Sequence, residues 1–66
     1  MYKELRKRYN LTQEQIAKVV NLATSNYNKV ENGKFVLTED RKKKLTKFYK
    51  EYSKIYEKYE KLLKKL

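Results

Sequence analysis

From residue 38 to residue 66 the sequence contains nothing that would interrupt a helix, and the whole chain has no Pro and only one Gly. Thr38, Glu39 and Asp40 form a typical helix start, because a hydroxyl can cap free backbone N–H groups and acids favour the positive end of the helix dipole. The sequence therefore predicts a final helix, about 40 Å long if it is unbroken. With so few helix breakers, we expect an all-α protein.

The apolar residues of this segment recur every seven residues in three columns: Leu45, Tyr52, Tyr59 and Leu66; Phe48, Ile55 and Leu62; Tyr49, Tyr56 and Leu63. They form a wide a/d/e stripe over about three heptads. A domain this small can cover the stripe only up to about residue 52, and an exposed apolar strip usually marks an interface. We therefore predict a homodimer interface made by Tyr52, Ile55, Tyr56, Tyr59, Leu62, Leu63 and Leu66. In two alternatives, the strip folds back on its own domain or binds a different protein.

The composition limits the function. A chain of 66 residues forms one small domain. The absence of Cys excludes disulfides and thiolate metal sites, and the further absence of His argues against a zinc site. The usual nucleophile and the usual general base are both missing. We expect no enzyme activity, no cofactor, no metal and no small-molecule ligand. No apolar run is long enough to span a membrane, and nothing resembles a signal peptide, so the expected location is the cytoplasm.

The net charge of +10 comes from 18 Lys and Arg against 8 Asp and Glu, and the excess is spread along the chain. A basic globular protein most often meets a polyanion, and nucleic acid is the first candidate. Simple solubility is the plainer explanation. A third interpretation makes the lysine-rich final helix a membrane-surface element, which the wide, Tyr-rich stripe argues against.

Before the final helix, the pattern predicts a helix over 2–9 and then two short helices within 12–31. Thr12 and Gln15 form a capping box at the first of these two helices. Asn21 tolerates the left-handed conformation that ends a helix. The second short helix is expected to begin near residue 23 or 24 and to end before Asn32-Gly33, the one strong turn dipeptide.

The run from Leu11 to Lys34, LTQEQIAKVVNLATSNYNKVENGK, resembles the Cro/phage-repressor-type helix-turn-helix (XRE) family at many fixed positions. The positions that carry the resemblance are Leu11, Thr12, Gln13, Ile16, Ala17, Val20, Leu22, Tyr27, Val30, Glu31, Asn32, Gly33 and Lys34. It implies a small lambda-repressor-like DNA-binding fold. We expect residues 1–50 to form the helix-turn-helix domain and residues 51–66 to form an extension of the last helix used for dimerisation.

The resemblance also implies roles for individual residues. The expected base-reading residues are Thr24, Ser25, Asn26, Asn28 and Lys29, and the expected phosphate contacts are Gln13, Asn32, Gly33 and Lys34. Arg6 and Glu31 are expected to form a structural ion pair. Ala23 departs from the family, which usually has Ser or Thr there. Because Ala cannot cap, Thr24 could take over the cap and shift the start of the helix by one residue.

Together these features favour a sequence-specific regulator of transcription that binds double-stranded DNA. The expected form is a homodimeric repressor, of phage or plasmid type, on a palindromic operator read through the major groove. The alternative is a protein-interaction module in which the final helix binds a partner protein.

Overall fold

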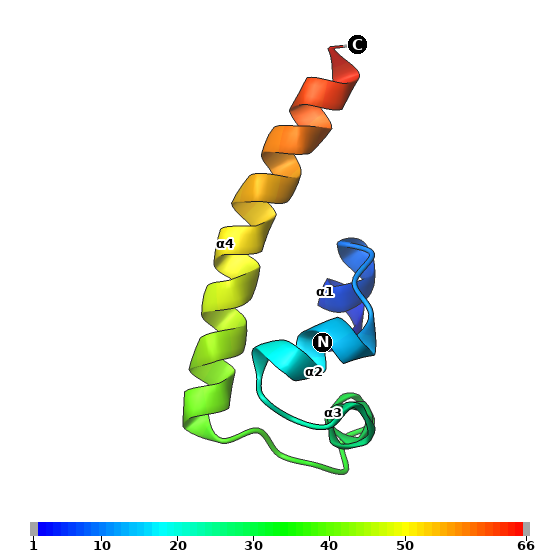
Figure 1. The fold of residues 1–66 in the computed structure, drawn as a ribbon, viewed down its shortest axis with the longest axis vertical. Coiled ribbons are helices and arrows are strands. Elements are labelled where there is room, and N and C mark those ends of the chain that lie inside the picture. Colours follow the sequence, from blue (N-terminus) through cyan, green and yellow to red (C-terminus); the bar gives the residue numbers. More distant parts are fainter. Residues whose placement is uncertain (1, 66) are drawn as a thin grey trace.

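The computed structural model describes residues 2–65, and these residues form four helices and no strand. The helices are α1 (Tyr2–Arg8), α2 (Gln13–Val19), α3 (Thr24–Glu31) and α4 (Glu39–Lys64). The three short helices gather at one end of the molecule, and α4 runs beside them and then beyond them (Figure 1). The predicted all-α fold with a long C-terminal helix is confirmed.

Each of the three short helices ends in the same way. Asn10, Asn21 and Gly33 follow the helices with positive φ angles of 57°, 57° and 74°. Two backbone hydrogen bonds close each turn; after α2, Asn21 N donates to Lys18 O and Leu22 N to Ala17 O. This is the Schellman arrangement, which satisfies carbonyl groups left open at a helix end. The predicted left-handed conformation of Asn21 is confirmed.

The helix starts differ in their caps. At α2, Gln15 N donates to Thr12 Oγ1 over 3.1 Å and Thr12 N donates to Gln15 Oε1 over 2.8 Å, so the predicted capping box is present. At α4, Arg41 N donates to Thr38 Oγ1 over 3.3 Å. At α3 the N-cap position is Ala23, which makes no side-chain cap, and Thr24 is the first helical residue. The suggested shift to a Thr24 cap therefore does not occur.

A single core lies where α2, α3 and the first half of α4 meet. Its buried members are Ile16, Ala17, Val20, Tyr27, Val30, Leu37, Leu45 and Tyr49. Ala17, with a single methyl group, is a buried member of α2. The buried residues of α4 lie at its N-terminal end, so the core secures only the first part of that helix.

The helix α4 is continuous over 26 residues, and the molecule is correspondingly long, with extents of 43 × 19 × 18 Å. Tyr9 extends the packing along α4, because its ring contacts the rings of Tyr49, Tyr52 and Tyr56 at centroid distances of 6.1, 5.6 and 5.1 Å. The intramolecular packing thus reaches one turn beyond the expected limit near residue 52. None of the described helices has the length and apolar character that a membrane crossing requires.

Candidate nucleic-acid interface

The helices α2 and α3 form a compact pair joined by the short turn at Asn21. In Figure 1, α3 lies below α2 and is seen nearly end-on, at the end of the molecule opposite the C-terminus. Ile16 of α2, Val20 at the C-terminal cap of α2 and Tyr27 of α3 are completely buried in the core. This packing fixes one face of α3 inward and leaves its other face to solvent.

The exposed face of α3 carries short hydroxyl, amide and ammonium groups. Thr24, Ser25, Asn28 and Lys29 are exposed, whereas Asn26 is half-buried. Four of the five residues expected to read bases therefore lie on the accessible face, and Asn26 is the least accessible.

The loop after α3 holds three of the expected phosphate contacts on the surface. Asn32, Gly33 and Lys34 are exposed. Lys34 N donates to Lys29 O over 2.8 Å and Gly33 N to Val30 O over 3.2 Å, so the loop backbone is tied to the end of α3. The position of the Lys34 backbone is therefore fixed relative to α3.

Arg6 and Glu31 join α1 to the last turn of α3. Arg6 Nε donates to Glu31 Oε2 over 2.7 Å and Arg6 Nη2 to Oε1 over 3.1 Å, while Arg6 Nη1 donates to Leu11 O over 3.0 Å. The two side chains are 11% and 2% exposed. Such a bidentate, nearly buried pair is strong and directional.

The charge state of Glu31 follows from these contacts. Burial by itself would raise the pKa of Glu31, but hydrogen bonds from Arg6 and Gln13 outweigh it and hold the pKa below its ordinary value of 4.5. The same pairing with Glu31 raises the pKa of Arg6. Both groups are therefore charged at neutral pH.

Gln13, the first residue of α2, also contacts the Arg6–Glu31 pair. Its Nε2 donates to Glu31 Oε1 over 3.1 Å, and its Oε1 accepts from Asn28 Nδ2 over 3.3 Å. Asn28 Oδ1 in turn accepts from Asn32 Nδ2 over 3.1 Å. The structure thus joins one expected base-reading residue to two expected phosphate contacts, and both polar atoms of the Gln13 side chain already have protein partners.

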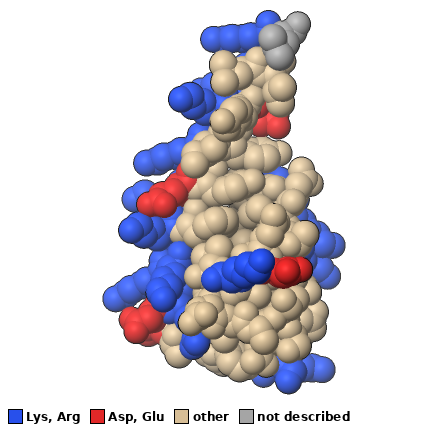
Figure 2. Space-filling model, viewed as in Figure 1, with Lys and Arg blue, Asp and Glu red and all other residues tan. Residues whose placement is uncertain are grey.

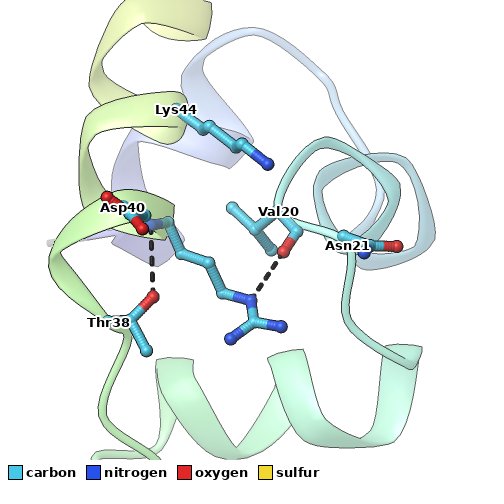
Figure 3. Close-up of a pocket in the computed structure, with 6 residues that line it drawn as sticks. Val20, Asn21, Thr38, Asp40 and Lys44 are labelled. Atoms are coloured by element: carbon cyan, nitrogen blue, oxygen red, sulfur yellow. Dashed lines mark hydrogen bonds between the residues drawn. The ribbon is translucent and has the colours of Figure 1, made fainter.

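Sequence reasoning missed Arg41. Its Nε donates to Val20 O over 2.9 Å, which ties the start of α4 to the end of α2 (Figure 3). The surrounding open pocket is lined by Val20, Asn21, Thr38, Asp40, Arg41 and Lys44. In the sequence, Arg41 is simply the first of four consecutive basic residues, so no local pattern distinguishes it.

The residues expected at the dimer interface fall into two groups. Tyr52 and Tyr56 are half-buried against Tyr9 of the same chain. Four others remain open: Ile55, Tyr59, Leu62 and Leu63 are 54%, 63%, 49% and 64% exposed. The strip therefore does not fold back on its own domain beyond Tyr56. The seventh predicted residue, Leu66, lies outside the described residues.

A comparison with protein families gives a match to the helix-turn-helix family model over residues 3–54. The match covers nearly all of α1, all of α2 and α3, and α4 as far as residue 54. No curated protein and no solved structure gives a match. Because the match spans most of the sequence and includes the capped α2, the Asn21 turn and the exposed α3, the chain belongs to the Cro/phage-repressor-type (XRE) helix-turn-helix family of DNA-binding regulators.

Proposed function

We propose that the protein is a homodimeric repressor that binds a palindromic operator and inserts α3 of each subunit into the major groove. The observation that carries the proposal is the exposed face of α3, where neutral donors and acceptors gather in a chain of net charge +10. Base edges are read by short groups that donate and accept, whereas phosphates are held by cations and backbone N–H groups.

In this proposal Thr24, Ser25 and Asn28 face base edges, with Asn26 as a minor contributor. Hydroxyl groups can pair with several bases, and an amide pairs best with adenine. Lys29, one turn further along α3 than Ser25, reaches guanine or a phosphate. The exposure of four of these five side chains supports their assignment.

Phosphates on either side of the groove would be held from two elements. Gln13 stands at the N-terminus of α2, where backbone N–H groups have no partner within the helix. Its side chain has one N–H left for a phosphate after donating to Glu31. On the other side, Asn32, Gly33 and Lys34 form the exposed loop after α3.

Self-association would use the part of α4 that projects past the core. The side chains exposed there are Ile55, Tyr59, Leu62 and Leu63. Figure 2 shows uncharged surface that continues up the molecule, with Lys and Arg gathered mainly along the left edge of the view. Residues 51–66 would thus be the dimerisation extension of a DNA-binding domain formed by residues 1–50. A C2 dimer then presents two copies of α3, as a palindrome requires.

Selection of bound duplexes from a random library tests this function. We expect an inverted repeat to be enriched, with binding to it that weakens steeply between about 50 and 200 mM salt because phosphate contacts release counterions. Enrichment of no motif, together with salt-independent binding, would contradict the proposal. That result would favour the alternative in which α4 binds a partner protein.

Single substitutions separate the two kinds of contact. Ser25→Ala and Asn28→Ala should mainly reduce the preference for operator over random duplex, whereas Lys34→Ala should weaken binding to both by a similar factor. Lys50→Ala removes the same charge from an exposed site on α4 and serves as the control for charge alone. If the Ser25 and Asn28 variants lost affinity equally for operator and random DNA, the base-reading assignment would be wrong.

A further inference from the structure

A continuous chain of hydrogen bonds runs from the buried Arg6–Glu31 pair to the surface of α3. Glu31 accepts from Gln13, Gln13 accepts from Asn28, and Asn28 accepts from Asn32, over 3.1, 3.3 and 3.1 Å. The chain crosses from α3 to α2 and back to α3. It begins among nearly buried groups and ends at exposed ones.

The direction of this chain is set at its buried end. Arg6 can only donate, and an ionised carboxylate such as Glu31 can only accept. Gln13 must therefore turn its NH₂ group toward Glu31, which points its carbonyl oxygen toward α3. That oxygen in turn requires a donor from Asn28, so Asn28 must direct Nδ2 toward Gln13 and leave Oδ1 on the side of Asn32.

A side-chain amide fixed in this way presents a defined pattern to a ligand. After its contacts with Gln13 and Asn32, Asn28 keeps one N–H and one lone pair of the carbonyl oxygen. Adenine offers one donor and one acceptor in the major groove and matches that pattern. Guanine offers two acceptors and does not match it. An amide free to rotate would adapt more easily to other bases.

We propose that Gln13 is a positioning residue that holds the Asn28 amide in one orientation and so makes α3 select adenine at the base pair that Asn28 faces. The inference rests on the proposed function, since it requires Asn28 to read a base. It adds a residue of α2 to the determinants of sequence specificity, in addition to any contact that Gln13 makes with phosphate.

The test is duplex selection from a random library with four full-length proteins: wild type, Asn28→Ala, Gln13→Met and Gln13→Glu. The position whose preference disappears in Asn28→Ala is the one that Asn28 reads, and wild type should prefer adenine over guanine there by about tenfold or more. Met keeps the length of Gln without a strong donor or acceptor. It should reduce the preference at this position to within about twofold of the Asn28→Ala value and leave the other positions unchanged.

Gln13→Glu is a second variant, whose carboxylate still accepts from Asn28 but loses the donation to Glu31 and meets that carboxylate as a like charge. It should keep more of the adenine preference than Gln13→Met, while lowering affinity for all duplexes because of its negative charge beside the DNA and lowering stability because of its repulsion from Glu31. A purely structural or phosphate-binding role for Gln13 would instead change affinity equally for adenine-containing and guanine-containing sites in both variants. Circular dichroism shows whether each variant folds. If one of the two Gln13 variants does not fold, the base preference of the other tests the inference.

The double variant Gln13→Met/Asn28→Ala completes a cycle, in which Gln13→Met should have no further effect on base preference once Asn28 is absent. Two outcomes overturn the inference: full adenine preference in Gln13→Met, or a base other than adenine at the position read by Asn28. An absence of any enriched motif with wild type would instead contradict the proposed function itself, so the two failures are distinguishable.

Discussion

Arg6 and Glu31 are nearly removed from solvent, and two hydrogen bonds join their charged groups. Removing one partner leaves the other charge buried without compensation, whereas removing both leaves only a packing defect. We expect Arg6→Met or Glu31→Leu to lower the free energy of unfolding by about 3 kcal/mol each. The double variant should lose less than the sum. Urea denaturation of the four proteins measures these values, and simple additivity would contradict the pairing.

The same pair predicts a dependence on pH. The pKa of Glu31 is lower in the folded chain than its ordinary value of 4.5, so folding favours the ionised form. Its stabilising effect is complete above pH 4.5 and is lost as the pH falls through the lower, folded pKa. Wild type should therefore lose stability more steeply than Glu31→Gln between about pH 4.5 and pH 3. Parallel slopes in thermal melts of the two proteins would argue against this account.

At Tyr49, by contrast, we expect a substitution that does not lower the free energy of unfolding. The ring of Tyr49 packs against Tyr9 and Phe48, but its buried hydroxyl has no hydrogen-bond partner among residues 2–65. Burial raises its pKa to about 12, which agrees with an apolar environment. Tyr49→Phe keeps the ring and removes the unsatisfied group, so it should leave stability unchanged or raise it by up to about 1 kcal/mol. Tyr9→Phe, at a half-buried ring, is the control. A large loss in Tyr49→Phe would indicate that the hydroxyl has a partner.

At the scale of elements, the start of α3 lacks the side-chain cap that the starts of α2 and α4 have. Ala23 has the extended backbone of an N-cap, with φ −65° and ψ 149°, but it offers no side-chain acceptor. Ala23→Ser should place a hydroxyl where the free N–H groups of α3 can donate, and raise the free energy of unfolding by about 1 kcal/mol. Thr12→Ala, which removes the existing cap of α2, should lower it by a similar amount. Thermal melts compare the two variants with wild type, and no gain from Ala23→Ser would mean that the N-cap geometry differs from the one described.

The helix boundaries show what the sequence could predict. Thr12, Asn21 and Thr38 act on neighbours within three or four residues, so their effects can be recognised from local patterns. The ion pair of Arg6 with Glu31 could be anticipated only because the resemblance to a family placed the two residues together. The contacts of Arg41 with Val20 and of Gln13 with Asn28 depend on how helices pack, and no local pattern encodes them. For the same reason, the cover that Tyr9 gives to Tyr56 was not expected.

At the scale of the whole molecule, the projecting part of α4 should determine the association state. Leu62→Glu places a charge in the open apolar strip, where it would have to be buried between two copies in the proposed dimer. Thr46→Glu makes the same change of charge at an exposed site on the packed half of α4. We expect sedimentation equilibrium to give a dimer for wild type and Thr46→Glu and a monomer for Leu62→Glu. A monomeric wild type at all concentrations, or a Leu62→Glu variant that remains dimeric, would contradict the proposed interface.

The hydrogen bond from Arg41 to Val20 has a consequence for the DNA itself. It fastens α4 to the end of α2, and α2 packs on the reading helix α3. In the proposed dimer, each α3 is therefore attached to the dimerising α4 of its own subunit without a flexible linker. Each base pair inserted between the half-sites moves the second one by about 3.4 Å and rotates it by about 34° around the duplex axis. A rigid dimer cannot follow that rotation, and so the operator should tolerate base changes in its centre far better than a change in the number of base pairs.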